Sequence, residues 1–299
     1  MLEQFFYPKT IAVIGASDNP EKVGYALMRN LFRFKGKIIP INIKRDKVMN
    51  IQAYRSVLKY KKDIDLAIIA IPKELVNDVL EQCGKKEIKH VIIISAGFSE
   101  TGDDKEEKRI LETAKKYNIN FLGPNCFGVC NPYLNLNTTF AREIPKQGEV
   151  AFISQSGALW SYISDYLKKR VGFSGFVSLG NMAQLSFDRF LEYFIDDKNT
   201  KAIVLYIEKI KHGRNFLRIA KKSKKPIYVI KAGKSKEGMK AAISHTGSLA
   251  TDYNIYKGVF KQAGIELCDS LLEAFEKASK KRKKRRYSLI NTSNNDRDR

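Results

Sequence analysis

The chain has 299 residues, 43% of them hydrophobic, which is long enough for two ordinary domains that each bury a core. No stretch approaches the roughly 20 uncharged apolar residues of a membrane helix, and the N-terminus lacks the order of a signal peptide, so we expect a globular, cytoplasmic protein. The net charge of +22 is spread along the chain apart from seven consecutive basic residues at 280–286, which favours solvated surface lysines over a nucleic-acid-binding domain.

The first 125 residues repeat a short apolar run, a turn and a helical stretch. The runs expected to be strands are 10–14, 37–43, 66–71, 90–95 and 120–122, and the expected helices are 23–34, 73–85 and 104–117. The runs are apolar throughout, as in strands that are covered on both faces. This alternation predicts an α/β fold in which residues 1–125 form a Rossmann-like domain with a parallel, doubly wound sheet.

A turn-rich stretch then separates this domain from a second one. Gly123, Pro124 and Asn125 end the first pattern, and we expect a linker over 126–147. A second α/β domain is expected over 148–279, and the polar tail 280–299 is expected to be disordered. The strands expected in the second domain are 149–153, 175–178, 202–207, 226–231 and 265–268.

The loop after the first strand has the composition of a phosphate-binding turn. Gly15, Ala16 and Ser17 lead into a helix, so backbone N–H groups can approach a phosphate, and Lys22 adds a positive charge. A tight turn without a ligand is the alternative. Later strands of this domain also end in breaks, at Pro72, Ala96, Gly97 and Asn125. Ligands of open α/β sheets bind outside this edge, so these loops together are expected to line one cofactor groove.

A second candidate phosphate site follows the first strand of the second domain. There the chain reads Ser154, Gln155, Ser156 and Gly157 and then continues into an apolar helix. Two hydroxyl groups and a glycine at the start of a helix can donate hydrogen bonds to phosphate oxygens. A serine that only caps the helix is the alternative.

The chain has three histidines, and His245 is the best candidate for a nucleophile. It lies among small residues in an expected mobile loop, and neutral imidazole attacks phosphorus or acyl carbon near its own pKa. Glu208 directly follows the strand at 202–207 and is the candidate carboxylate that orients the imidazole. An ordinary surface histidine and a strand-end glutamate are the alternatives. The four cysteines are scattered, so reduced thiols and no metal site are expected.

In combination, these motifs resemble the α-type subunit of the NDP-forming acyl-CoA synthetases, most closely the ADP-forming acetyl-CoA synthetase branch, with succinyl-CoA synthetase α more distant. The segments that carry the resemblance are 14–17, 123–126, 153–158, 179–181, 231–233 and 244–250. The resemblance implies a Rossmann-like CoA-binding domain followed by a flavodoxin-like domain of the succinyl-CoA synthetase type. Its reaction passes from acyl-CoA through acyl phosphate and a phosphohistidine to NTP.

The resemblance also implies roles for individual residues. His245 matches the phosphorylated histidine, and Glu208 matches the carboxylate that orients it. The CoA loops match Gly15, Ala16, Ser17, Lys22, Pro72, Ala96, Gly97 and Asn125, and the phosphoryl cradle matches Ser154, Gln155, Ser156 and Gly157. Lys209, Gln184 and Thr251 differ from the residues usual in the family.

The implied enzyme is larger than this chain. A β-type subunit with an ATP-grasp domain is expected to carry Mg²⁺ and ADP or ATP, and the third domain usual in the α chain is expected to be missing. The substrates are CoA, phosphate and a carboxylic acid. The alternative is a non-catalytic CoA-binding or regulatory protein on the same fold. Weak nucleic-acid binding through residues 280–286 is a third possibility.

Overall fold

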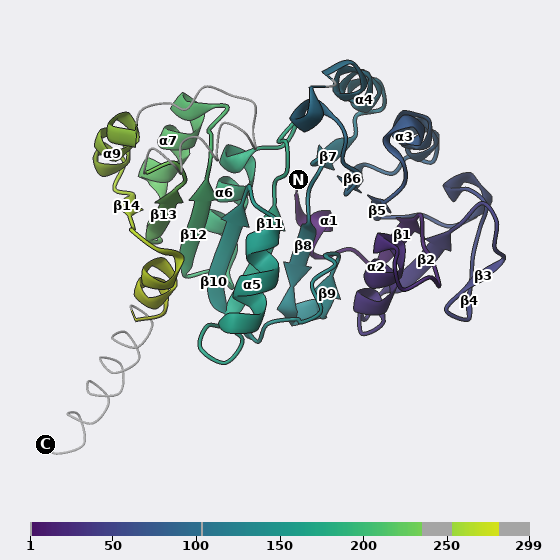
Figure 1. Cartoon of the computed structure of the whole chain (residues 1–299), viewed down its shortest axis with the longest axis horizontal. Helices are drawn as coiled ribbons and strands as arrows, with labels where there is room; N and C mark the ends of the chain where they lie inside the picture. Colours follow the sequence, from purple (N-terminus) through teal and green to yellow (C-terminus); the bar gives the residue numbers. More distant parts are fainter. Residues whose placement is uncertain (1, 103, 235–252, 281–299) are drawn as a thin grey trace, which may run out of the picture.

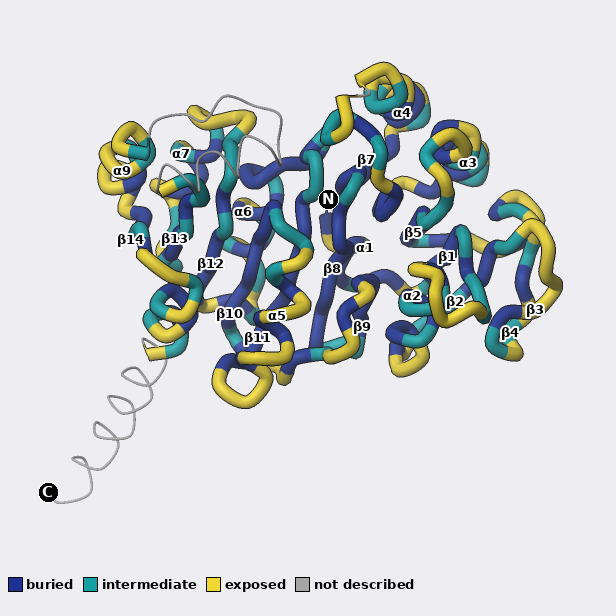
Figure 2. The backbone as a smooth tube through the Cα atoms, viewed as in Figure 1, coloured by how far each residue is buried: buried dark blue, intermediate teal, exposed yellow. Residues whose placement is uncertain are grey.

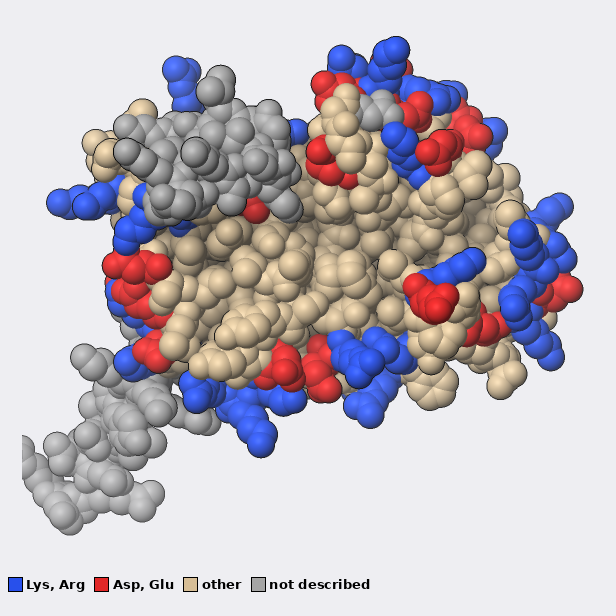
Figure 3. Space-filling view, in the orientation of Figure 1, with Lys and Arg blue, Asp and Glu red and all other residues tan. Residues whose placement is uncertain are grey.

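The computed structural model describes residues 2–102, 104–234 and 253–280. Two α/β units lie side by side, each built on its own sheet, and the N-terminus lies between them (Figure 1). Within the described ranges, no helix combines the length and the hydrophobicity needed to cross a membrane. On the face drawn in Figure 3, Lys and Arg side chains gather towards the edges, so the positive charge there is not concentrated in one central patch.

The first unit contains a five-stranded parallel sheet of order β2-β1-β5-β6-β7. Its strands are β1 (Thr10–Ile14), β2 (Lys37–Ile41), β5 (Leu66–Ile69), β6 (His90–Ile93) and β7 (Asn120–Leu122). Its helices are α2 (Val23–Leu31), α3 (Val76–Lys85) and α4 (Asp104–Tyr117). The predicted parallel, doubly wound sheet is confirmed. The sequence did not predict the small hairpin of β3 (Lys47–Val48) and β4 (Ile51–Gln52), whose turn places Met49 and Asn50 in the left-handed region.

The second unit contains a seven-stranded sheet of order β14-β13-β12-β10-β11-β8-β9. Five of its strands are parallel: β10 (Gln147–Ser154), β11 (Phe173–Ser178), β12 (Ala202–Ile207), β13 (Ile227–Lys231) and β14 (Glu266–Leu267). The helices with printed bounds are α5 (Ala158–Tyr166), α6 (Phe187–Asp196), α7 (Gly213–Lys222) and α9 (Tyr253–Gln262), and residues 271–280 are also helical. The stretch 126–147, predicted as a linker, supplies the antiparallel strands β8 (Gly128–Asn131) and β9 (Leu136–Asn137) at one edge.

The parallel strands follow the same order in both units. In each sheet the second strand in the chain lies on one side of the first, and the third, fourth and fifth strands lie on the other side. The direction of winding therefore reverses between β1 and β5, and again between β10 and β12. A crevice opens at the carboxyl ends of the strands at such a reversal, and it is the usual ligand site of open α/β sheets.

Side chains alternate between the two faces of each sheet, and one core is shared by both units. On β1, Ile11 and Val13 belong to the shared core, whereas Ala12 and Ile14 pack on the opposite face, against α3 and α4. The shared core continues through α2 to α6, α7 and α9 of the second unit. The remaining face of the second sheet is covered by α5 and the helix at 271–280.

The short helix α1 (Glu3–Phe6) joins the two units. Its residues Phe5 and Phe6 are fully buried, and α1 lies at the junction in Figure 2. The ring of Phe5 lies edge-on to His90 of β6 at 5.2 Å and to Phe190 of α6 at 6.1 Å. Phe6 stacks on Tyr193 at 4.7 Å. Because one short helix contacts β6 of the first unit and α6 of the second unit through large apolar rings, the relative position of the units is fixed by core packing.

Gln184 adds a polar link between the units. Its Oε1 accepts a hydrogen bond from Phe121 N at 2.6 Å, and its Nε2 donates to Ile119 O at 2.9 Å. Both groups lie at the edge strand β7, so the amide pairs with that strand as a neighbouring backbone would. A carboxylate at this position would lack the donor for the second bond. A glutamine at position 184 is therefore suited to the packing of the two units.

Replacing Phe5 by alanine is expected to lower the free energy of unfolding by about 3–5 kcal/mol, because it removes a buried ring and leaves a cavity between the units. Urea denaturation followed by circular dichroism measures this change. The matched control is Phe32→Ala at the end of α2, where the side chain is 74% exposed, and a change within about 0.5 kcal/mol is expected. Equal losses in the two variants would contradict the role assigned to α1.

Candidate active site

A cavity of about 1300 Å³ lies between the two units. Its walls include loops at the carboxyl ends of strands from both sheets, so the two winding reversals open into the same space. Pockets for small ligands typically measure about 300–1,000 Å³, so this one has room for a large ligand. The predicted site residues that line it are Gly15, Ala16, Ser17, Lys22, Pro72, Ala96, Asn125, Gln155, Ser156, Gly157 and Glu208.

The loop after β1 depends on two glycines. Gly15 has a φ of +91°, and a Cβ on it would lie 2.2 Å from Ala70 O. A Cβ on Gly24, in the first turn of α2, would lie 1.9 Å from Gly15 O. The helix therefore begins in direct contact with the preceding loop, and no side chain among the described residues caps its N-terminus at Lys22. This brings the positive end of the helix dipole to the cavity, as a phosphate site requires.

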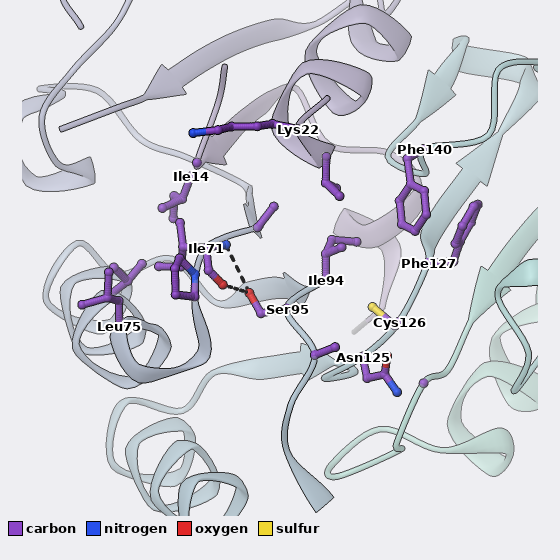
Figure 4. Close-up of a pocket in the computed structure, with 18 of the residues that line it drawn as sticks. Ile14, Lys22, Ile71, Leu75, Ile94, Ser95, Asn125, Cys126, Phe127 and Phe140 are labelled. Carbon is purple, nitrogen blue, oxygen red and sulfur yellow. Dashed lines mark hydrogen bonds between the residues drawn. The ribbon is translucent and has the colours of Figure 1, made fainter. Parts of the chain in front are cut away.

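The loops that follow β5 and β6 are joined by a serine. Ser95 Oγ donates to Ile71 O at 2.6 Å and accepts from Ile71 N at 3.2 Å, as the dashed lines in Figure 4 show. Both residues line the cavity. The predicted strands 66–71 and 90–95 end two residues earlier in the structure because their last residues belong to these loops.

Sequence reasoning missed two cationic residues at the first-unit end of the cavity, Lys44 and Arg55. Arg55 forms an ion pair with Asp46 at 3.1 Å, which orients its guanidinium. Lys44 follows β2, the strand next to β1. The rule that ligands bind at the carboxyl ends of strands could have found Lys44, whereas Arg55 carried no such signal.

Two predicted ligands are engaged elsewhere and do not line the cavity. Gly97 N donates to Glu100 Oε1 at 2.5 Å, and Asn181 of the second unit donates to Glu100 Oε2 at 2.5 Å. Ser154 is fully buried, with its Oγ donating to Ser156 O at 2.8 Å and accepting from Ser156 N at 3.1 Å. Gly97 thus belongs to a contact between the units, and Ser154 shapes the turn before α5.

Gln155 also has a structural role in this loop. Its side-chain Oε1 accepts hydrogen bonds from Glu208 N at 2.6 Å and from Lys209 N at 2.8 Å. The amide therefore holds the end of β12 against the loop after β10 and fixes the backbone at Glu208. Burial lowers the pKa of the nearby Lys231, and the charge of Glu208 opposes that shift. Glu208 thus lies close to a buried cation on β13, in addition to lining the cavity.

His245 and Thr251 lie outside the described residues, as do the basic residues 281–286 of the tail. Before the gap, the described chain continues to Lys234, three residues beyond the end of β13. β13 is paired in parallel with β12, which leads directly to Glu208. The chain thus enters the segment that contains His245 from the same sheet edge as Glu208.

Comparison with known proteins finds a separate family match for each of the two units. A family model described as "CoA binding domain" matches residues 9–132, and one described as "Succinyl-CoA ligase like flavodoxin domain" matches 147–279. The chain is 48% identical over 284 residues to acetate–CoA ligase [ADP-forming] II subunit alpha of Pyrococcus furiosus, covering 93% of this chain and 62% of that protein. It is 52% identical over 267 residues to acetate–CoA ligase [ADP-forming] of Methanocaldococcus jannaschii, covering 88% of this chain and 38% of that protein. The chain belongs to the α-type part of the NDP-forming acyl-CoA synthetase family.

A solved member of this family has the same fold. It is the dinucleotide forming acetyl-coenzyme A synthetase 1 of Ca. Korarchaeum cryptofilum in complex with phosphate and ADP. The two chains superpose with a TM-score of 0.89 at 40% identity, over 93% of this chain and 61% of that one. The chain therefore spans less than two thirds of the length of these relatives.

Replacing Gln155 by alanine is expected to lower the free energy of unfolding by about 1–3 kcal/mol, because two partly buried N–H groups lose their acceptor. The matched control is Gln147→Ala, since Gln147 is exposed and its side chain donates one long hydrogen bond, of 3.4 Å, to Pro132 O. Urea denaturation of both variants measures the difference. Indistinguishable midpoints would show that Gln155 does not hold the end of β12.

Cys126 is expected to resist alkylation although it lines the cavity. Its side chain is 4% exposed, and burial raises the pKa of its thiol to about 12. At pH 8 the thiolate fraction is then about 10⁻⁴, against about a quarter for a thiol of ordinary pKa. Mass spectrometry after iodoacetamide treatment should show modification at least about 100-fold slower in the folded protein than in urea. Equal rates in the two states would contradict this.

Proposed function

We propose that this chain is the CoA-binding, phosphohistidine-carrying α-type component of an NDP-forming acyl-CoA synthetase. It interconverts acyl-CoA, NDP and phosphate with a carboxylic acid, CoA and NTP. The observation that carries the proposal is the single cavity formed by both winding reversals. Such a cavity can hold a CoA thioester in one unit and present its reacting end to the other.

The two ends of the cavity suit the two parts of this reaction. Lys22, Lys44 and Arg55 supply positive charge at the first-unit end, where the phosphates of CoA bind in the proposed complex. The start of α5 and Glu208 lie in the second unit. In the proposed complex the Ser156 hydroxyl and the N–H groups at the start of this helix bind the phosphoryl group.

The proposed reaction proceeds in three steps. An oxygen of inorganic phosphate attacks the thioester carbonyl carbon, the carbon–sulfur bond breaks, and CoA leaves as a thiolate that takes up a proton. An imidazole nitrogen of His245 then attacks the phosphorus of the acyl phosphate and releases the carboxylate. The terminal phosphate of NDP finally accepts the phosphoryl group from the histidine. Glu208 holds the imidazole in the correct tautomer and stabilises its charged form.

The proposal includes a partner subunit and a compartment. Two similar proteins from Pyrococcus furiosus are named as α subunits, which supports a partner. We propose that this partner is a β-type subunit whose ATP-grasp domain carries Mg²⁺ and ADP or ATP. All four cysteines are free and buried, which supports a reducing, cytoplasmic environment.

Phosphohistidine formation tests the proposal directly. The protein is co-purified with the β-type subunit from the same genome and incubated with acyl-CoA, Mg²⁺ and radiolabelled phosphate. We expect label that is labile in acid and stable in base, its loss in His245→Ala, and labelling that is slower by about 100-fold or more in Glu208→Gln. The matched control is His212→Ala, whose exposed histidine at the start of α7 has no assigned role, and it should label normally.

The alternative function predicts a different outcome in the same experiment. A non-catalytic CoA-binding or regulatory protein would bind CoA with unchanged affinity in His245→Ala and would take up no label as wild type. Isothermal titration calorimetry with CoA gives the binding measurement. CoA binding without label in the wild-type complex would overturn the proposed reaction and keep only the CoA site.

A further inference from the structure

The loop after β11 brings a side chain of the second unit against the first. Asn181 lies in this loop between Gly180 and Met182, which both have left-handed backbones, with φ of +57° and +56°. For a residue other than glycine this conformation costs free energy and persists where the surrounding structure fixes it. A Cβ on Gly180 would lie 2.2 Å from Pro124 O, and the N–H of Asn181 donates to the same oxygen at 3.0 Å. The backbone of this loop is therefore held tightly on the first unit.

The side-chain amide of Asn181 bonds two acidic residues of the first unit. Its Nδ2 donates to Glu100 Oε2 at 2.5 Å and to Glu107 Oε2 at 3.1 Å. It also lies 3.2 Å from Ser99 Oγ, which itself donates to Glu107 Oε2 at 2.6 Å. An ionised carboxylate only accepts hydrogen bonds, so this pair needs a donor between them. A carboxylate at position 181 would have the same shape and would supply none.

Glu100 connects this amide to a loop that is expected to face CoA. Its Oε1 accepts a hydrogen bond from Gly97 N at 2.5 Å, and its Oε2 accepts one from Phe98 N at 3.1 Å. Phe98 is fully buried, whereas Ala96 on the other side of Gly97 is exposed and lines the cavity. The position of Ala96 at the cavity therefore depends on Glu100 and, through it, on Asn181.

Asn181 also contacts a second loop that is expected to face CoA. Asn125 Nδ2 donates to Asn181 Oδ1 at 3.3 Å, and Asn125 N donates to Ser95 O at 2.9 Å. Asn125 lines the cavity and lies beside Cys126 in Figure 4. One side chain of the second unit thus meets two of the first-unit loops that were predicted to hold CoA.

The start of the same loop is joined to the predicted phosphoryl site. Ser178, the last residue of β11, pairs with Ser154 in the parallel register, and Leu179 N donates to Ser154 O at 2.8 Å. Ser154 in turn shapes the turn before α5. Residues 178–181 are therefore a short backbone connection between the phosphoryl site of the second unit and the CoA loops of the first.

From these contacts we infer that Asn181 is a positioning residue for the first step of the proposed reaction. It holds the CoA loops in a set position relative to the phosphoryl site, so that the thioester carbonyl carbon lies within reach of the attacking phosphate. The inference rests on the proposed function and adds a residue that acts through Glu100 and Asn125. Displacement of a reacting group by about 1 Å can lower a rate about 100-fold, so loss of the amide acts on the rate more than on CoA affinity.

Single-turnover labelling of His245 tests the inference in the complex of this chain with its β-type subunit. The complex is mixed with Mg²⁺, radiolabelled phosphate and a series of acetyl-CoA concentrations, which gives a maximal labelling rate and a half-saturating concentration. In Asn181→Ala we expect a maximal rate about 10–100-fold lower, with the half-saturating concentration within about threefold of wild type. Asn181→Asp should be at least as impaired, because it keeps the shape of the side chain and removes the donor.

Asn199→Ala is the matched control. Asn199 is another half-buried asparagine of the second unit, and its Nδ2 donates to the Tyr7 hydroxyl at 3.1 Å, outside the cavity. Its maximal labelling rate should stay within about twofold of wild type. Thermal melting of Asn181→Ala and Asn199→Ala reports the loss of stability in each.

A second substitution tests the connection through Glu100. If Asn181 and Glu100 act in one chain of contacts, their effects are not additive. In a Glu100→Ala background, Asn181→Ala should therefore lower the maximal rate by less than about threefold further. Fully additive losses would show that Asn181 acts by another route and would overturn the inference.

The remaining outcomes separate the inference from the proposed function. A wild-type rate in Asn181→Ala or in Asn181→Asp would show that the amide does not position the thioester. Equal losses of rate in Asn181→Ala and Asn199→Ala would show a general loosening of the two units and would also overturn the inference. In these cases the wild-type complex is labelled and the proposed function stands. Without label in the wild-type complex, the proposed function fails and the inference fails with it.

Discussion

The core shared by the two sheets is the constraint on which the rest of the structure depends. It runs without interruption from β1 and α2 of the first unit to α6 of the second and is joined by the rings of α1. Interfaces between domains are commonly more polar than this and allow relative motion. Here the two sheet edges are held opposite one another by apolar packing, so a ligand that reaches from one to the other finds both in place.

Polar contacts add to the apolar core in fixing the positions of the two units and their loops. The amide of Asn181 reaches from the second unit to Glu100 and Glu107 of the first, and Gln184 pairs with the edge of β7. Within the second unit, Gln155 holds the end of β12. The side chains of Asn181 and Gln155 position loops that line the cavity, whereas Gln184 joins the two units at an edge strand outside it. A residue that a sequence motif predicts to bind the substrate can therefore position a loop of the site instead.

The sequence predicted most of the parallel strands because buried strands in α/β sheets leave apolar runs that are easy to detect. The runs that became β1, β7 and β12 have the same bounds in the structure. It missed β8 and β9 because these short antiparallel strands lie in a turn-rich stretch with prolines. The structural roles of Gln155 and Gly97 could not be predicted from the sequence either. They depend on hydrogen bonds with Glu208 and Glu100, which are brought into contact only when the chain folds. The structure brings most of the loops that were predicted at the carboxyl ends of the strands to one cavity, whereas Gly97 and Ser154 do not line it.

The buried position of α1 has a consequence for the order in which the chain assembles. Phe5 and Phe6 emerge early in synthesis, yet the rings that cover them, Phe190 and Tyr193, belong to α6, which is made much later. During translation, Phe5 and Phe6 therefore stay exposed to water or bound to a chaperone until α6 has been synthesised. Contacts so distant in sequence also slow folding, because a long loop must close before they form. Completion of the first unit is in this sense a late event that depends on the second.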